Sequence, residues 1–121
     1  MLMRQKIAAI KKKFGYDDLI KPSFLLPDSE NLVIAQKNDE YFHVKLDGTP
    51  AYKQRFEWVG PFCEGLASVR KGGKFFHIRP DGTPAYEERF EWAGHFLRGR
   101  SRVREEHGEI FFIRPDGARV D

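Results

Sequence analysis

Cysteine is almost absent from this chain of 121 residues, since Cys63 is the only one. A single thiol excludes an internal disulfide framework and a cysteine-based zinc site. Long apolar runs are missing too. The apolar run at residues 7–10 is too short for a signal-peptide core, and no segment approaches the ~20 apolar residues of a membrane-spanning helix. These absences predict a soluble, cytoplasmic protein without a membrane span.

The sequence also lacks a catalytic constellation, because no motif brings a nucleophile and a base together. Hydrophobic residues make up 40% of the chain and charged residues 32%, which is typical of a folded domain and not of a disordered one. Aromatic residues are plentiful, and 11 of them are Phe. We therefore expect one globular protein without cofactor, metal or enzymatic activity.

Positive charge is concentrated at the N-terminus. Residues 1–22 carry a net charge of +4 and the remaining residues −1. Apolar residues in this segment are spaced by four, three and four positions, which places them on one face of a short helix. They are Met3, Ile7, Ile10 and Phe14. Lysines 11–13 fall in the last turn, where cations complement the helix dipole, and Gly15 is a natural end.

Two interpretations of this amphipathic helix are open. It could be a basic arm that binds a membrane surface or nucleic acid. It could instead pack over the end of a sheet with its lysines in water. The apolar face spans only two to three turns and lacks Trp, which favours the second interpretation. We assign residues 1–22 to this helix and a linker, and residues 23–121 to a separate domain.

An internal repeat dominates the rest of the chain. Residues 41–70 and 75–104 align without gaps at an offset of 34, with 17 of 30 positions identical. When each unit is taken to begin at the third strand, the chain divides into a partial copy at 32–58, a copy at 66–92 and a truncated copy at 100–121. Apolar and polar residues alternate at 42–46 and at 76–79, which indicates strands, and Asp-Gly and Gly-Gly pairs mark turns between them.

The pattern of each repeat therefore predicts three short antiparallel strands, at about 41–46, 51–58 and 65–70 in the first copy. The fold expected is mainly β: an antiparallel meander of about eight or nine strands, curled or partly propeller-like, with a short N-terminal helix. Such a meander exposes sheet edges and an apolar face. The helix is expected to cap one end, and a partner subunit could cover another surface.

The stretch GPFCEGLASVRKGGKFFHIRPDG at 60–82 resembles the WG-repeat family of bacterial proteins. The match includes the Phe62, Glu64-Gly65-Leu66-Ala67 and Val69 positions of the family pattern. The name-giving Trp-Gly pair is replaced by Tyr41-Phe42, Phe75-Phe76 and Ile110-Phe111. The resemblance covers residues 32 to 121. It implies a β-rich, propeller-like repeat module that serves as a binding or scaffolding unit, and it implies no activity.

Three kinds of residue within the repeat have open interpretations. His43 and His77 occupy matching slots, and the third copy has Phe112 there, which favours packed or hydrogen-bonded rings over metal or anion ligands. Cys63 corresponds to Leu97, which favours a buried thiol over a nucleophile. The tryptophans of the RFEW segments could form an aromatic surface for a sugar or peptide, or pack the repeats together, which we favour. They are Trp58 and Trp92.

Four arginines mark the strongest departure from the repeat. Arg98, Arg100, Arg102 and Arg104 alternate with other residues, so a strand would align their guanidiniums on one face. They could bind an anion such as nucleic acid, a phosphorylated ligand or an acidic partner. They could instead pair with neighbouring carboxylates or contact another subunit, which is favoured. The candidate carboxylates are Glu87, Glu88, Glu91 and Glu109.

These observations predict a non-enzymatic protein-interaction or scaffolding module, with self-association into a homo-oligomer among its possible uses. The alternative is a protein that binds nucleic acid or another polyanion through the arginine strand and the N-terminal lysines. Steep loss of binding with added salt would distinguish the alternative.

Overall fold

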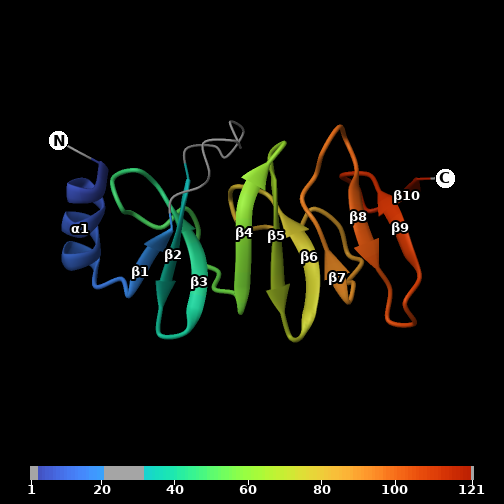
Figure 1. Cartoon of the computed structure of the whole chain (residues 1–121), viewed down its shortest axis with the longest axis horizontal. Helices are drawn as coiled ribbons and strands as arrows, with labels where there is room; N and C mark the ends of the chain where they lie inside the picture. Colours follow the sequence, from blue (N-terminus) through green and yellow to red (C-terminus); the bar gives the residue numbers. More distant parts are fainter. Residues whose placement is uncertain (1–2, 21–31, 121) are drawn as a thin grey trace.

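The computed structural model describes residues 3–20 and 32–120, and Figure 1 shows how their elements are arranged. One helix, α1, spans Met3–Phe14. Ten strands follow it in the described residues. They are β1 Asp18–Ile20, β2 Val33–Lys37, β3 Glu40–Val44, β4 Trp58–Cys63, β5 Leu66–Lys71, β6 Lys74–Ile78, β7 Trp92–Ala93, β8 Ser101–Arg104, β9 Ile110–Ile113 and β10 Arg119–Val120. The prediction of a mainly β, antiparallel fold with an N-terminal helix is confirmed.

The strands form three antiparallel sheets that follow one another along the chain. Sheet 1 has the order β1-β2-β3, sheet 2 the order β4-β5-β6, and sheet 3 the order β10-β9-β8-β7. In Figure 1 they succeed one another along the long axis, from α1 at one end to β8 and β9 at the other. A three-stranded sheet buries little apolar surface alone, so stacking on neighbouring repeats supplies the core. The described residues form an open stack and not a closed barrel.

The helix covers the outer side of sheet 1, as the sequence predicts. Ile7, Ile10 and Phe14 are partly buried against the core. The ring of Tyr16, just after the helix, stacks on Phe14 with centroids 5.5 Å apart, and its hydroxyl donates to a backbone carbonyl 2.6 Å away in the turn at residue 48. Strand β1, which follows α1, pairs with β2. The first sheet therefore includes part of the segment assigned to the helix and linker, and the junction at residues 22–23 lies outside the described residues.

The predicted strand over residues 51–58 is wrong. The backbone of this segment hydrogen-bonds to the backbone of β3 at two places: Ala51 donates to the His43 carbonyl at 2.9 Å, and Phe56 exchanges two hydrogen bonds with Tyr41. Between them the chain loops out, and Arg55 Nη1 donates to the carbonyls of residues 52, 53 and 54 at 3.4, 3.1 and 3.1 Å. Those carbonyls are satisfied locally, so they do not need a strand partner. The next strand begins only at residue 58.

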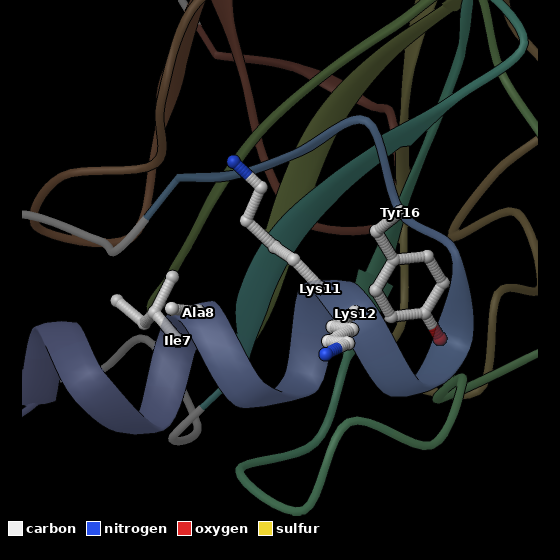
Figure 2. A pocket seen from close by; sticks show the side chains of 5 residues that line it. All are labelled: Ile7, Ala8, Lys11, Lys12 and Tyr16. Carbon is white, nitrogen blue, oxygen red and sulfur yellow. The ribbon is translucent and has the colours of Figure 1, made fainter.

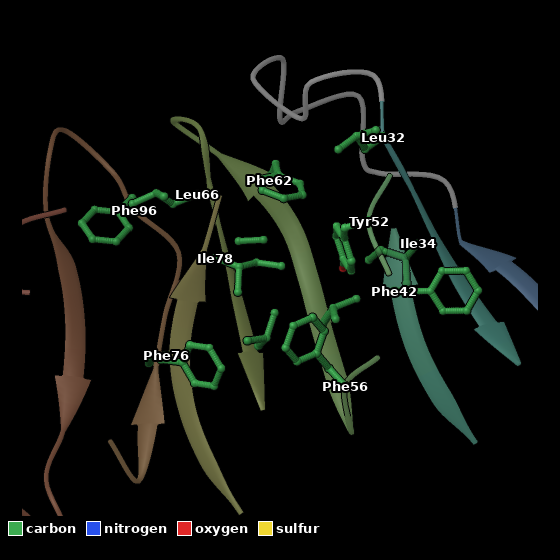
Figure 3. Close-up of a cluster of buried hydrophobic side chains, with 14 of the residues drawn as sticks. Leu32, Ile34, Phe42, Tyr52, Phe56, Phe62, Leu66, Phe76, Ile78 and Phe96 are labelled. Atoms are coloured by element: carbon green, nitrogen blue, oxygen red, sulfur yellow. The ribbon is translucent and has the colours of Figure 1, made fainter. Parts of the chain in front are cut away.

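Aromatic rings from the sheets and from the loops between them make up much of the core (Figure 3). The ring of Phe56, in the loop after sheet 1, meets Phe76 of sheet 2 edge-on with centroids 6.2 Å apart. Phe90, in the equivalent loop after sheet 2, meets Phe111 of sheet 3 at 6.1 Å. Burying one such ring is worth about 1.5–3 kcal/mol, so these contacts hold successive repeats together.

Candidate interaction surface

A buried histidine joins sheet 1 to sheet 2. The His43 Nε2 atom lies 2.8 Å from the Gly60 carbonyl oxygen, and Nδ1 lies 2.6 Å from the Tyr52 hydroxyl. Because a carbonyl can only accept, Nε2 carries the proton and the hydroxyl of Tyr52 donates to Nδ1. The ring also packs on Phe62 of sheet 2, with centroids 4.5 Å apart. This side chain therefore fixes the start of the next repeat by two kinds of contact.

The second histidine repeats this arrangement between sheets 2 and 3. His77 Nε2 lies 2.8 Å from the Gly94 carbonyl oxygen, and Nδ1 lies 2.5 Å from the Tyr86 hydroxyl. Both His43 and His77 are fully buried. Burial disfavours the charged ring and lowers the pKa of each to about 4. The prediction that both rings are packed or hydrogen-bonded is confirmed.

Two more side chains of sheet 2 hold the start of sheet 3. The buried Ser68 hydroxyl donates to the Ala93 carbonyl at 2.7 Å. The Glu64 carboxylate accepts hydrogen bonds from the backbone N–H groups of Arg98 at 2.6 Å and of Gly99 at 2.8 Å. Charge-assisted hydrogen bonds of this kind are stronger than neutral ones. The side of sheet 2 that faces sheet 3 is thus equipped to bind the next repeat.

Arginines occupy the positions of sheet 3 that correspond to these two contact residues of sheet 2 and to the buried Leu66 between them. At a spacing of 34 residues, Glu64 corresponds to Arg98, Leu66 to Arg100 and Ser68 to Arg102. A carboxylate acceptor, a buried apolar side chain and a small buried hydroxyl are each replaced by an exposed cation. Sheet 3 therefore does not repeat the contacts by which sheet 2 binds its successor.

The outward side of sheet 3 combines arginines with apolar side chains, and we call it the end face. Its residues are Trp92, Arg100, Arg102, Arg104, Ile110 and Phe112. Strand pairing sets Arg104 between Trp92 and Ile110, and Arg102 opposite Phe112, so their side chains point to the same side. The three apolar residues are 38–51% exposed. An open hollow of about 340 Å³ lies over Trp92, Arg102, Arg104 and Ile110.

The four candidate arginines are not all brought together. Arg100, Arg102 and Arg104 alternate with the buried Ser101 and Val103, so they share one side of β8 and its approach. Arg98 lies instead in the turn before this strand, with a positive φ of 54°. The end face therefore includes three guanidiniums of the predicted stripe.

None of the four glutamates considered as partners forms an ion pair with an arginine of the end face. Glu91 pairs with Lys74, and Glu109 pairs with Arg119 at 2.7 Å. No ion pair in the described part of the chain joins a carboxylate to an arginine of the end face. The Arg100 guanidinium lies over the Phe112 ring instead, 4.6 Å from its centroid. The guanidinium N–H donors of the end face are thus available to an acceptor from outside.

The ring of each candidate tryptophan lies over the glycine two residues after it in the sequence. A Cβ at Gly60 would lie 3.1 Å from the Trp58 ring, and a Cβ at Gly94 would lie 2.8 Å from the Trp92 ring. The two rings remain 40% and 44% exposed. Trp58 also contacts Phe75, with centroids 5.9 Å apart. Both tryptophans therefore have a packing role within their sheets, and Trp92 in addition contributes to the end face.

The lone thiol is buried, as its exchange with leucine predicts. Cys63 is 4% exposed, and its Sγ donates to the Pro61 carbonyl at 3.8 Å. Leu97, at the corresponding position of the next repeat, is 63% exposed. The two positions therefore differ in burial although they are equivalent in sequence. Leu97 adds apolar surface at the same end of the stack.

The N-terminal lysines lie at the other end of the molecule. An open hollow of about 530 Å³ runs along α1, lined by Ile7, Ala8, Lys11, Lys12 and Tyr16 (Figure 2). Figure 1 places α1 at the end of the stack opposite β8 and β9. The lysines and the end-face arginines therefore belong to two separate surfaces.

The sequence model of the WG containing repeat matches residues 45–75. The chain carries a WG-type repeat. The resemblance found in the sequence is thereby confirmed, and no curated protein matches the chain. The matched residues cover the loop after sheet 1 and the strands β4 and β5, and they end within β6. This WG-type repeat thus includes both the aromatic loop and the following sheet.

Phenylalanine occupies equivalent positions in the three sheets, at residues 42, 76 and 111, and a guanidinium lies over each ring. The distances from the guanidinium carbon to the ring centroid are 3.7 Å for Arg55 on Phe42, 3.8 Å for Arg89 on Phe76 and 4.4 Å for Arg119 on Phe111. Arg89 also donates to the carbonyls of residues 86, 87 and 88, as Arg55 does in its own loop. Phenylalanine at these positions therefore supports the arginine that shapes the loop.

Sequence reasoning missed the contribution of Ile110 and Phe112 to the end face. The signal was present for Phe112, which stands in the slot of the buried histidines. In the described residues, no group of three or more His, Cys, Asp or Glu could hold a metal ion. No helix there is long and apolar enough to cross a membrane.

Proposed function

We propose that this protein is a non-enzymatic interaction module that binds a protein partner through its end face. One observation carries the proposal: arginines and exposed apolar side chains stand where the preceding sheet binds its neighbour. Aromatic side chains and arginine are enriched at the energetically dominant positions of protein interfaces. Among the described residues, none of the three guanidiniums of the end face forms an ion pair, although Arg104 lies near enough to Glu91 to help lower the pKa of that carboxyl.

The use of the histidines supports the non-enzymatic part of the proposal. A general base must reach the proton that it removes from a substrate. His43 and His77 are fully buried, and both nitrogens of each ring are hydrogen-bonded within the protein. The repeated His–Tyr pairs therefore serve the packing of the repeats.

Binding of nucleic acid or another polyanion is the second candidate, supported by the two basic surfaces. These surfaces lie at opposite ends of the stack (Figure 1), so one short polyanion does not contact both. Self-association has weaker support, because α1 covers one end of the stack and like-charged arginines cover the other. We therefore take the single chain as the species that binds.

Site-specific photocrosslinking in lysate from the source cells tests the proposal. A photocrosslinking amino acid is placed at position 112, in the end face, or at position 46 as a matched control. Phe112 and Leu46 have similar exposure, 38% and 41%, but Leu46 lies in the first repeat. We expect a discrete protein adduct at position 112 that is absent at position 46. Equal labelling at both positions, or none at position 112, would contradict the proposal.

A further inference from the structure

Resting on the proposed interaction at the end face, we infer that its occupant is an extended, acidic segment of a partner protein that carries an aromatic side chain. The equivalent faces of sheets 1 and 2 are already occupied within this chain. Sheet 3 differs from both at the positions that contact the covering segment.

An extended segment with a Gly-x-Phe pattern covers both inner faces. On sheet 1, the Gly60 carbonyl accepts from His43 Nε2, and the Phe62 ring packs on the same histidine at 4.5 Å. On sheet 2, residues 94 and 96 make the same contacts to His77, at 2.8 Å and 4.5 Å. The face of each repeat is thus shaped to receive an extended chain with one aromatic side chain and a backbone acceptor.

Compared with the corresponding side of sheet 2, the end face still presents an aromatic ring, and it carries more hydrogen-bond donors. Phe112 replaces the histidine ring, so an aromatic side chain can still pack there. Arg102 replaces Ser68, whose single hydroxyl donates to one carbonyl in sheet 2. Arg100 replaces the buried Leu66. A guanidinium offers five N–H donors and no acceptor, so the occupant must supply several acceptors.

Carboxylates meet this requirement best, because they form bidentate, charge-assisted hydrogen bonds with guanidinium groups. Arg100, Arg102 and Arg104 are two residues apart, which spaces their Cα atoms by about 7 Å along the strand. Alternate side chains of an extended peptide have the same spacing. Carboxylates at alternate positions of the partner segment therefore match the arginines, and its aromatic side chain lies against Phe112.

The surroundings of the end face favour an acidic peptide over a nucleic acid. A nucleic acid backbone requires a positive track over many phosphates. Glu105 and Glu106 follow directly after Arg104, so the positive charge ends there and does not continue as a track for a long backbone. The N-terminal lysines, which could extend the track, lie at the far end of the stack (Figure 1). The positive charge is therefore short in extent, as a peptide requires.

Selection of random displayed peptides on the whole protein tests this inference. The face variant Arg100→Glu/Arg102→Glu serves for comparison, and Lys45→Glu/Arg114→Glu makes the same charge change at exposed sites elsewhere. Thermal unfolding of each variant verifies folding. We expect selected peptides to be rich in Asp and Glu around one aromatic residue. The face variant should weaken their binding at least about tenfold, and the control variant should change it little. Phe112→Ala should remove the preference for the aromatic residue.

The other outcomes separate this inference from the proposed function. Peptides that depend on the end face but lack acidic or aromatic residues would overturn the inferred chemistry and leave the proposed function intact. Failure to select any peptide that depends on the end face would overturn both. Binding of a single-stranded DNA oligonucleotide that the face variant abolishes, without such peptides, would replace the partner segment by nucleic acid.

Discussion

The buried histidines make the stability of this protein depend on pH. Burial lowers the pKa of His43 and of His77 from 6.5 to about 4. The unfolded chain therefore binds more protons than the folded one between these values, and the free energy of unfolding falls as the pH drops from about 6.5 to about 4. Above pH 6.5 the rings are neutral in both states, and the free energy of unfolding no longer depends on them. Lowering the pKa to about 4 corresponds to a loss of about 3 kcal/mol of stability per ring once the pH has fallen below that value.

Replacing one of these rings should reduce the acid sensitivity. We predict that His77→Phe, which copies the residue of the third repeat, lowers stability at neutral pH, because Tyr86 and the Gly94 carbonyl each lose a partner. Its free energy of unfolding should then change less between pH 7 and pH 5 than that of the wild type. Urea unfolding at several pH values measures both effects.

A matched control uses a histidine that is exposed. His107 lies in the turn between β8 and β9, so His107→Gln should leave the pH dependence unchanged. Titration of the ring by NMR gives a second readout that does not need the variant to be stable. The prediction fails if the His77 ring in the wild-type protein becomes charged at its ordinary pKa.

At the scale of elements, the loop between one sheet and the next depends on a single arginine. Arg89 donates to three successive carbonyls and stacks on Phe76 at 3.8 Å. A lysine cannot form this planar set of contacts. We predict that Arg89→Lys lowers the free energy of unfolding by about 1–2 kcal/mol, because three loop carbonyls lose their donor and the Phe76 ring loses its stacking partner.

Chemical denaturation measures this loss, and an exposed arginine provides the control. Arg114 is exposed in the turn after β9, so Arg114→Lys should change stability by less than about 0.5 kcal/mol. Equal effects of the two substitutions would show that the loop does not depend on the guanidinium of Arg89.

This loop also shows how far the sequence predicts the elements. Alternation at residues 42–46 and the turn glycines predicted β3 and β5 to within a few residues, because those signals are local. The segment 51–58 has the composition of a strand, but its carbonyls are bound by a side chain of the same loop. Such contacts between a side chain and nearby carbonyls leave no periodic signal, so the loop could not be told from a strand.

The sequence likewise predicted only part of the end face. Alternation alone placed Arg100, Arg102 and Arg104 on one side, as the structure has them. The absence of carboxylate partners could not be predicted, because Glu91 and Glu109 pair with cations that are distant in sequence or on other strands. The contribution of Phe112 required knowing that its equivalents are covered by the next repeat.

At the scale of the whole molecule, the two ends of the stack are closed by different means. Helix α1 covers the apolar side of sheet 1 with Ile7, Ile10 and Phe14. Sheet 3 instead carries arginines where sheet 2 carries the residues that bind its successor. Stacking another sheet on this side would bury the arginines without ion-pair partners, which is costly. We infer that the arginines disfavour the stacking of another sheet on the end face while leaving donors for a partner.

Placing the corresponding residues of sheet 2 in sheet 3 should therefore make the protein self-associate through the end face. The triple variant Arg98→Glu, Arg100→Leu, Arg102→Ser recreates them, removes like-charge repulsion and enlarges the apolar surface around Phe112. We predict that the wild type has the mass of one chain, 14.1 kDa, by light scattering coupled to size exclusion, and that the triple variant forms dimers or larger species as concentration rises. Lys45→Glu, Lys53→Leu, Arg114→Ser makes the same changes at exposed positions elsewhere and should remain monomeric. If the triple variant stays as monomeric as this control, the charge of the end face does not prevent another sheet from stacking there. The arginines would then serve binding alone.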